Sequence, residues 1–439
     1  MTDAPRHHER DQRTSAVRHG RLPQRRAIGA IAKILVAIVA VVAVSAGSVA
    51  AYAFWDVTRS IKKGVELVAL PGHTAQQSIP SVGAISGGVN LLLAGTDTRS
   101  NQGGIYDLQQ EQDASTGAGN NDVTMLLHIA QDHKSAMVIS FPRDLMVPIP
   151  DCPDPNGNGT ISGSDLDMFN TALSRGGLAC VVLTVEKLTG AQIPFAAAVD
   201  FNGVSAMSNA IGGVTVCLAT PVTDEYTNPP LDLPAGENTL VGDQALSFLR
   251  SRHGVGDGSD LGRISNQQVF LSALARKVVS GGVLSNPVQL YGLAKAAVKN
   301  ITPSQSLANP TTLVQIGLAM KETGLGNMVF MQYPVYSDPD NANRVVVNQD
   351  AADTLNNALV KDLPVQLTGT TGRAAETAPA PTLSPAPTTT PAPTAPSAPT
   401  SPATPAPAVT PTPGQTSVPL PADITGQTAA QQTCTKGNN

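Results

Sequence analysis

Carboxylate and guanidinium groups flank three short apolar runs in the first third of the chain, and such groups suit the binding of phosphate and divalent metals. Aspartate supplies the hard oxygen ligands that Mg²⁺ (or Mn²⁺) prefers, usually one or two of them together with substrate phosphates. Arginine matches phosphate oxygens with paired hydrogen bonds. These groups are Asp97 and Arg99 after residues 89–94, Asp122 before residues 123–130, and Arg143 and Asp144 after residues 136–141.

A second constellation lies near position 260. Arg263 and Gln267 are four residues apart at the start of a predicted helix, so their side chains share one face. Arg250 and Arg252 are two residues apart before Gly254, and in an extended segment both would point to the same side. Three arginines directed at one place repel one another unless an anion lies between them. A phosphate or pyrophosphate is the natural occupant.

The spacing of the apolar runs predicts that these groups meet. Residues 131–134 form a predicted hairpin turn between the second and third runs, which places Asp122 opposite Arg143. If residues 89–94 run beside the third strand in the same direction, Asp97 and Arg99 reach the same edge. The alternative is a surface salt-bridge cluster, which would contribute little.

Strand-like and helix-like segments alternate between about residues 89 and 364. Residues 89–94, 123–130 and 136–141 are predicted strands, and residues 177–188, 243–249 and 263–279 are predicted helices. This interleaving predicts a layered α/β domain.

The N-terminal region predicts a membrane anchor. Residues 34–55 carry no charge and are long enough to cross a bilayer, and residues 1–26 hold seven arginines against three acidic residues. We therefore expect a basic cytoplasmic tail (1–26), a single transmembrane signal-anchor (27–55), a linker (56–87) and an extracytoplasmic domain (88–370). The alternative is a signal peptide cleaved after residues 51–53 (AYA).

The composition excludes several classes of function. Charged residues make up only 14%, aromatic residues 3%, and the net charge is −5, which argues against a nucleic-acid binder. The chain lacks a phosphate-binding loop of the GxxxxGK[ST] type, an HExxH motif and a GxSxG motif, which argues against nucleotide, zinc and serine-hydrolase enzymes.

The C-terminal region 371–439 is rich in Pro, Thr and Ala, which predicts a disordered spacer or a dispensable tail. The four cysteines lie on the predicted outer side and allow three pairings. Cys152–Cys180 is favoured because it closes the shortest loop; alternatively, some cysteines are simply buried. Residues 154–165 have the spacing of an EF-hand calcium loop, but two prolines in 145–150 argue against an entering helix.

These clusters resemble those of the LytR-CpsA-Psr family of cell-wall enzymes over about residues 88–280. The matching pieces are NLLLAGTDTRS, NDVTMLLHI, VISFPRD, VDFNGVSAMSNAIGGV, LDLPAGENTLVGDQALSFLRSRH and GDGSDLGRISNQQVFL. The resemblance implies a three-layer α/β/α domain with a central mixed sheet and an apolar cleft for a polyprenyl tail. It also implies an Mg²⁺-dependent phosphotransferase that moves a glycopolymer from polyprenyl pyrophosphate to peptidoglycan, forming a phosphodiester.

The resemblance also assigns roles to individual residues. Asp97 and Asp122 would hold the metal, and Asp144 and Asp260 would orient the arginines. Asn266 departs from the family pattern, since many members carry another arginine there, so one phosphate contact would be missing. The residues that would bind pyrophosphate are Arg99, Arg143, Arg250, Arg252, Arg263 and Gln267. Among all these, the residues expected to act in catalysis are Asp97, the candidate general base, Arg143 and Arg263.

Two other functions are alternatives for the same residues. A pyrophosphatase acting on the lipid pyrophosphate differs only in using water as the acceptor. A non-catalytic wall-binding or regulatory protein would leave the Asp and Arg constellation without a role. The Ala- and Pro-rich composition makes arabinogalactan a candidate polymer.

Overall fold

The computed structural model describes residues 24–68, 88–98, 118–157, 159–283, 286–378 and 417–438. Two compact units can be distinguished, with a boundary after Asp56. Helix α1 (Gln24–Ser60) supplies the described part of the first unit with its residues 24–56. Its portion Ile31–Ser60 reaches a mean hydropathy of 2.6 and is long and apolar enough to cross a membrane. The predicted span 27–55 lies within this helix.

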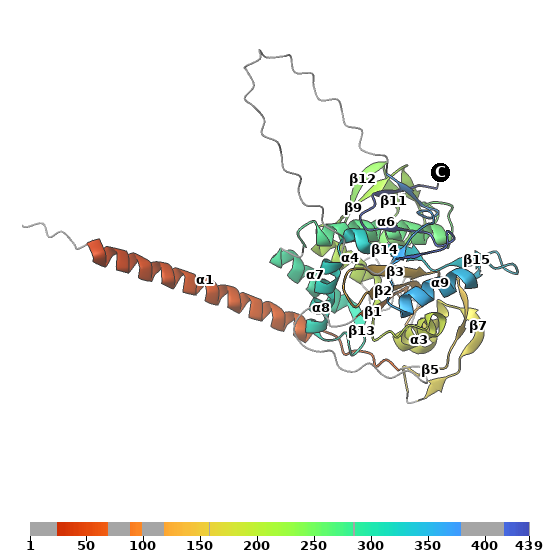
Figure 1. The fold of residues 1–439 in the computed structure, drawn as a ribbon, viewed down its shortest axis with the longest axis horizontal. Coiled ribbons are helices and arrows are strands. Elements are labelled where there is room, and N and C mark those ends of the chain that lie inside the picture. The colour runs from red at the N-terminus through yellow and green to blue at the C-terminus, as the bar shows by residue number, and fades with distance from the viewer. Residues whose placement is uncertain are drawn as a thin grey trace, which may run out of the picture. The chain divides into compact units, whose positions relative to one another are not determined.

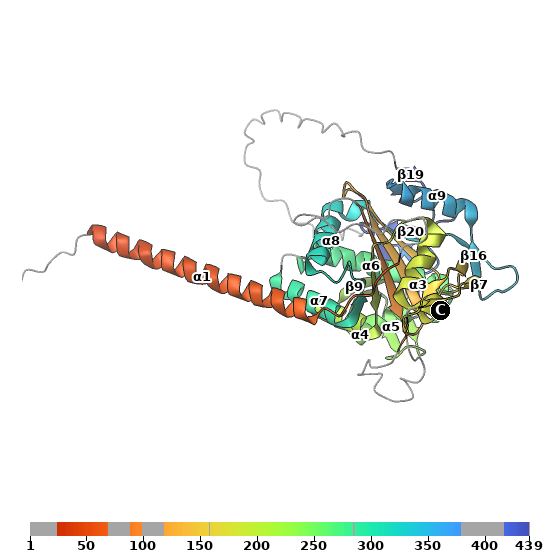
Figure 2. The ribbon, with the colours of Figure 1, turned by 90° about the horizontal axis from the view of Figure 1, so that it is seen from below.

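The second unit is built on a mixed seven-stranded sheet (Figures 1 and 2). Strand β2 is antiparallel to both β1 and β3, whereas the pairs β1–β8 and β3–β14 are parallel. In spatial order the strands are β13 (Ile301–Pro303), β8 (Phe195–Val199), β1 (Val89–Thr96), β2 (Asn121–Ile129), β3 (Ala136–Phe141), β14 (Met328–Gln332) and β20 (Gly426–Thr428).

Helices cover both faces of this sheet, because its strands carry apolar side chains on alternate faces. On one face, Leu92 and Leu126 pack with α3 (Thr171–Thr189) and α9 (Gln349–Val360). On the other face, Leu91 and Leu127 pack with α6 (Asp260–Val279) and α8 (Pro310–Thr323). Figures 1 and 2 show α3 and α6 on opposite sides of the strands. The expected α/β/α layering is therefore present.

The described part of the second unit also contains three further helices and several short strand pairs. The helices are α4 (Phe201–Ala210), α5 (Asp243–Arg250) and α7 (Pro287–Asn300). The short pairs are β4 (Met146–Ile149) with β7 (Ser164–Met168), β5 (Cys152–Pro153) with β6 (Thr160–Ile161), β10 (Val222–Asp224) with β11 (Leu231–Leu233), β15 (Val335–Ser337) with β16 (Val345–Val347), and β17 (Val365–Gln366) with β19 (Val418–Pro419); η3 (Leu325–Asn327) is a short 3₁₀ helix.

The folded domain does not end near residue 370, which corrects the predicted boundary. Residues 417–438, the C-terminal segment, return to the domain and add β20 to the main sheet. They also add β21 (Thr433–Thr435) to a second sheet with β12 (Gly236–Leu240), β9 (Val214–Leu218) and β18 (Ala375–Thr377). A disulfide joins Cys217 of β9 to Cys434 of β21. Residues 379–416, which hold most of the Pro-rich region, lie outside the described residues.

The predicted linker 56–87 also differs from expectation. Helix α1 continues to Ser60, and Val65 forms a β-bridge with Ser304. Val65 makes two backbone hydrogen bonds in this bridge. Its N–H donates to the Pro303 carbonyl, and its carbonyl accepts from the Gln305 N–H. Residues 57–68 therefore belong in part to the second unit, while residues 69–87 lie outside the described part of the chain.

Candidate functional site

The predicted hairpin places Asp122 beside Arg143. Strands β2 and β3 pair with Thr124 opposite Phe141, the register that a turn centred between residues 132 and 133 requires. Beyond this pair, Arg143 Nη1 donates to Asp122 Oδ1 over 3.0 Å. The expected partner of β1 was wrong, because β1 pairs with β2 rather than β3. Since β1 is antiparallel to β2, its C-terminal end still reaches the same edge.

Arg143 lies among three carboxylates. Its Nε is 3.6 Å from Asp144 Oδ1 and 3.5 Å from Asp260 Oδ1. Burial lowers the pKa of Arg143, but the charges of Asp122, Asp260 and Asp144 outweigh this effect and raise the pKa above its usual value. Asp144 responds differently, since burial and the charge of Asp260 raise its pKa more than Arg143 lowers it. The cluster therefore holds a permanent guanidinium charge at the sheet edge.

Helix α6 brings a second arginine to the same place. Ser259 caps the helix by accepting from the Gly262 N–H, and Asp260 in the first turn forms an ion pair with Arg263. Arg263 Nη2 also donates to the backbone oxygen of Asp122 over 2.8 Å. Full burial lowers the pKa of Arg263 despite the nearby Asp260. Asp260 thus contacts both Arg143 and Arg263, the orienting role predicted for it.

Gln267 follows one turn after Arg263, and both line one cleft, as the four-residue spacing predicted. The Gln267 Nε2 donates to the Leu249 carbonyl over 2.9 Å. Asn266 points elsewhere. It is fully buried, donates to the Phe248 carbonyl and accepts from the Thr435 hydroxyl, so it contacts the C-terminal segment rather than the cleft.

Arg250 and Arg252 also line this cleft, although their local structure is not the extended pair that the spacing suggested. Arg250 is the last residue of α5, and Arg252 follows the helix end at Ser251. The guanidinium of Arg250 lies 4.2 Å from the ring centroid of Phe201, a cation–π contact. Arg143, Arg250, Arg252 and Arg263, which we call the arginine cluster, therefore converge from three parts of the chain.

Asp97 lies beside the cleft rather than in its wall. Its Oδ1 accepts from the Asn120 N–H over 2.6 Å and so closes the loop before β2. Gly119, with φ +67°, lies under this carboxylate, where a side chain would collide with Asp97 Oδ1. Asp97 is not among the described residues that line the cleft, whereas Asp122 is. Arg99 lies outside the described residues.

The cleft itself is an apolar cavity of about 520 Å³ with the arginine cluster in its wall. The main sheet contributes Leu93, Val123, Met125 and Val199, and helices α4, α5, α6 and α7 supply most of the other apolar side chains. We call this cavity the apolar cleft. The family resemblance implied an apolar cleft, but none of its apolar lining residues was predicted from the sequence. The apolar side chains on α4, α5 and α7 are Phe201, Val204, Met207, Leu246, Leu249 and Leu293.

One further carboxylate in the cleft wall was missed from the sequence. Asp200 caps α4 by accepting from the Gly203 N–H over 2.8 Å, and burial raises its pKa. Its signals in the sequence were its place in the piece VDFNGVSAMSNAIGGV and its position before a helix, which is that of an ordinary N-cap residue.

The donor set fits Mg²⁺ only with help from substrate. Asp122 faces the cleft, and Asp97 follows the neighbouring strand, where Thr96 pairs with Asn121. Among the residues that the structure describes, no group of three His, Cys, Asp or Glu side chains could hold a metal alone. Mg²⁺ commonly binds through one or two carboxylates and substrate phosphates, so a metal at this edge would take ligands from a bound pyrophosphate.

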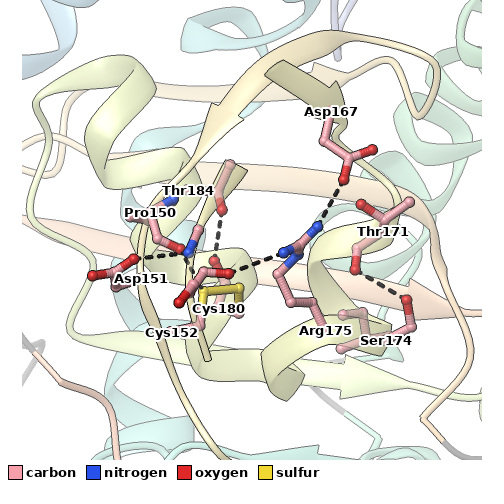
Figure 3. Close-up of a disulfide and its surroundings, with 12 residues drawn as sticks. Pro150, Asp151, Cys152, Asp167, Thr171, Ser174, Arg175, Cys180 and Thr184 are labelled. Carbon is pink, nitrogen blue, oxygen red and sulfur yellow. Dashed lines mark hydrogen bonds and ion pairs between the residues drawn. A yellow bond between two sulfur atoms is a disulfide. The ribbon is translucent and has the colours of Figure 1, made fainter. Parts of the chain in front are cut away.

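The region with EF-hand spacing is instead a disulfide-linked hairpin (Figure 3). Strand β4, paired with β7, precedes it in place of an entering helix. Asp154 is engaged locally, since its carboxylate accepts from the Asn156 N–H. The favoured disulfide Cys152–Cys180 is present and joins β5 to α3. Nearby, Arg175 forms a 2.8 Å ion pair with Asp167.

Comparison with known proteins agrees with this geometry. The LytR_cpsA_psr family model matches residues 61–361. The cell wall biosynthesis protein LcpA of Corynebacterium glutamicum is 30% identical over 276 residues, which make up 58% of this chain and 51% of LcpA. This chain therefore spans about half the length of that relative. The Bacillus subtilis polyisoprenyl-teichoic acid–peptidoglycan teichoic acid transferase TagT is 25% identical over 356 residues, or 79% of this chain and 99% of TagT.

A solved structure shares the fold. The crystal structure of Streptococcus agalactiae protein gbs0355 superposes with a TM-score of 0.50 at 21% identity, covering 63% of this chain and 88% of that one. The family match includes α3, α4, α5 and α6 and every residue of the arginine cluster. Since that match extends over well more than half of the sequence, the chain belongs to the LytR-CpsA-Psr family.

Proposed function

We propose that this protein is a membrane-anchored transferase that moves a glycopolymer from a polyprenyl-pyrophosphate carrier to a hydroxyl of peptidoglycan. The observation that carries the proposal is the apolar cleft with the arginine cluster in its wall. A polyprenyl pyrophosphate has the matching halves, because its chain is apolar and its headgroup is a compact polyanion. The relatives named for cell wall biosynthesis and for transfer of polyisoprenyl-linked teichoic acid support the same assignment.

The proposed reaction exchanges a phosphoanhydride bond of the donor for a phosphate ester bond to the acceptor. The acceptor oxygen forms a bond to the phosphorus that carries the glycopolymer, the bond from that phosphorus to polyprenyl phosphate breaks, and the hydroxyl proton goes to a base, for which Asp97 is the candidate. Arg143, Arg250, Arg252 and Arg263 stabilise the charge on the phosphate oxygens and on the leaving phosphate. When bound, Mg²⁺ would add positive charge beside Asp122 and Asp97.

The anchor and the disulfides support an extracytoplasmic location. The basic residues before α1 favour a cytoplasmic N-terminus, which places the second unit outside the cell. The disulfides Cys152–Cys180 and Cys217–Cys434 fit an oxidising compartment of this kind. A lipid-linked pyrophosphate carries its own activation, so the reaction needs no ATP there.

The test uses the full-length protein in lipid nanodiscs with a labelled glycopolymer on polyprenyl pyrophosphate and purified peptidoglycan. We expect label to become covalently attached to peptidoglycan through a phosphodiester. Release of labelled glycopolymer phosphate into solution, with none on peptidoglycan, would instead identify a pyrophosphatase. No turnover of the donor under any condition would favour a non-catalytic wall-binding role.

A further inference from the structure

A second cavity lies next to the arginine cluster. It has a volume of about 560 Å³, and Arg143 and Arg252 line both this cavity and the apolar cleft. We call it the polar groove. Its remaining walls come from the start of α6 and the loop before it, the connection between β15 and β16, and the segment before β18. The side chains on which the argument depends are Asp144, Asp257, Asn343, Arg344 and Arg373.

The chemistry of the polar groove is opposite to that of the apolar cleft. Arg373 and Asp257 form a 2.7 Å ion pair and are 50% and 42% exposed, so both can also reach a ligand. Arg344 is half-buried, and its Nη1 donates to the backbone oxygen of Asn343. A guanidinium carries five N–H donors, so others remain for a ligand. Alternating donors and acceptors of this kind suit a ligand with many hydroxyls and some carboxylates, as in a saccharide chain that bears peptides.

The position of the groove relative to the phosphate site decides which saccharide it takes, and this step rests on the proposed function. In phosphoryl transfer the attacking and leaving oxygens are roughly in line across the phosphorus. The leaving group is polyprenyl phosphate, whose apolar chain belongs in the apolar cleft. Among the described residues, a phosphate held by Arg143 and Arg252 would have the polar groove as a second neighbouring cavity. The groove therefore offers the attacking hydroxyl a path to this phosphate that is separate from the apolar cleft.

We infer that the polar groove is the binding site for the acceptor sugar strand, with Arg344 and Arg373 as its acceptor-binding residues. Neither arginine lines the apolar cleft, so the two reactants use separate contacts and share only Arg143 and Arg252. The glycan of the lipid-linked donor is also a saccharide chain. The experiment below distinguishes binding of this donor glycan from binding of the peptidoglycan acceptor.

The experiment measures binding of three probes to the full-length protein in nanodiscs: soluble disaccharide-peptide fragments of peptidoglycan, geranylgeranyl pyrophosphate, and the lipid-linked glycopolymer. The variants are Arg344→Ala and the double variant Arg344→Ala/Arg373→Ala. Arg175→Ala is the control, because Arg175 is a partly exposed arginine with an aspartate partner outside both cavities. Melting temperatures verify that each variant is folded, and Arg344→Lys keeps the charge but loses the fork.

We expect Arg344→Ala to weaken fragment binding about tenfold or more, since a hydrogen bond to a charged group contributes at least that much. Binding of geranylgeranyl pyrophosphate should stay within about twofold of wild type. Unchanged fragment binding in the double variant, or an equal loss in Arg175→Ala, overturns the inference. So does a selective loss of lipid-linked glycopolymer binding, which would assign the groove to the donor glycan. If geranylgeranyl pyrophosphate fails to bind even the wild type, the proposed function fails first.

Discussion

The hydroxyl of Thr435 donates a 2.8 Å hydrogen bond to the side-chain oxygen of Asn266, which joins the last strand of the chain to helix α6. Both groups are fully buried. The same helix carries Arg263 and Gln267 into the apolar cleft on its other side. Gln427 adds a second link, donating to the Gln268 carbonyl and the Ser272 hydroxyl at 2.8 Å each. The C-terminal segment therefore supports the helix that carries Arg263 of the arginine cluster.

Thr435→Val should destabilise the protein, because it leaves the Asn266 oxygen buried without its donor. Such a loss costs about 1–3 kcal/mol in the free energy of unfolding. Thr433→Val is the matched control on the same strand, since its buried hydroxyl has no hydrogen-bond partner within the described structure. Chemical denaturation of both variants checks the prediction. Equal stability of the two would show that the Asn266 contact contributes nothing.

Cys434→Ser should lower the stability of the protein, because it removes the disulfide with Cys217. The disulfide closes a loop with a sequence separation of 217, and removing a native disulfide typically costs about 2–5 kcal/mol. Deleting residues 372–439 should be at least as damaging, because it also removes β20 and β21. Thermal unfolding under oxidising conditions is the measurement. If the truncated protein melts at the wild-type temperature, the C-terminal segment does not stabilise the domain.

Arg143→Ala should reduce transfer by about 10³-fold or more, the scale of an arginine that stabilises phosphoryl-transfer charge. The melting temperature should change little, because Arg143 lies at the sheet edge and outside the apolar cores. Arg175→Ala serves as the control and should keep normal activity. Retention of more than about a tenth of wild-type activity by Arg143→Ala would be incompatible with the proposed role.

Asp122→Asn should raise the Mg²⁺ concentration needed for half-maximal activity, since a neutral amide is a poorer ligand for a hard cation. Asp97→Asn should do the same and should also loosen the loop that Asp97 closes through the Asn120 N–H. Activity is titrated against Mg²⁺ and Mn²⁺ after chelation. Wild-type activity that persists in excess chelator would refute the metal assignment for both residues.

The ion pair between the buried His128 and the partly exposed Asp362 should make stability depend on acidic pH. Burial raises the pKa of Asp362, but hydrogen bonds from His128 and the Gln131 N–H outweigh this and lower the pKa below its usual value. A carboxylate whose pKa is lower in the folded state than in the unfolded state stabilises the fold at pH values above the unfolded-state pKa. This stabilisation is lost as the pH falls through the folded-state pKa. Asp362→Asn should therefore make the free energy of unfolding depend less on pH below about pH 4. An identical acid limb in both proteins, measured by urea denaturation, would contradict this.

Local sequence patterns determined several relationships in the site. The position of the turn between β2 and β3 sets their register, which is why Asp122 and Arg143 could be matched from numbering alone. The four-residue spacing of Arg263 and Gln267 places both on one helix face because an α-helix has 3.6 residues per turn. The long apolar helix α1 was predicted from local composition. The disulfide Cys152–Cys180 was predicted because it closes the shortest loop.

Only the tertiary structure decided which distant segments meet. The strand beside β1, the walls that α4, α5 and α7 add to the apolar cleft, and the return of residues 417–438 all depend on contacts between segments far apart in sequence. Asn266 illustrates the limit, since its place in the motif predicted only a missing phosphate contact, whereas its hydrogen bond with Thr435 could be found only in the tertiary structure. Periodicity specifies which face of an element is apolar, but the partner of that face is selected by packing of the whole domain.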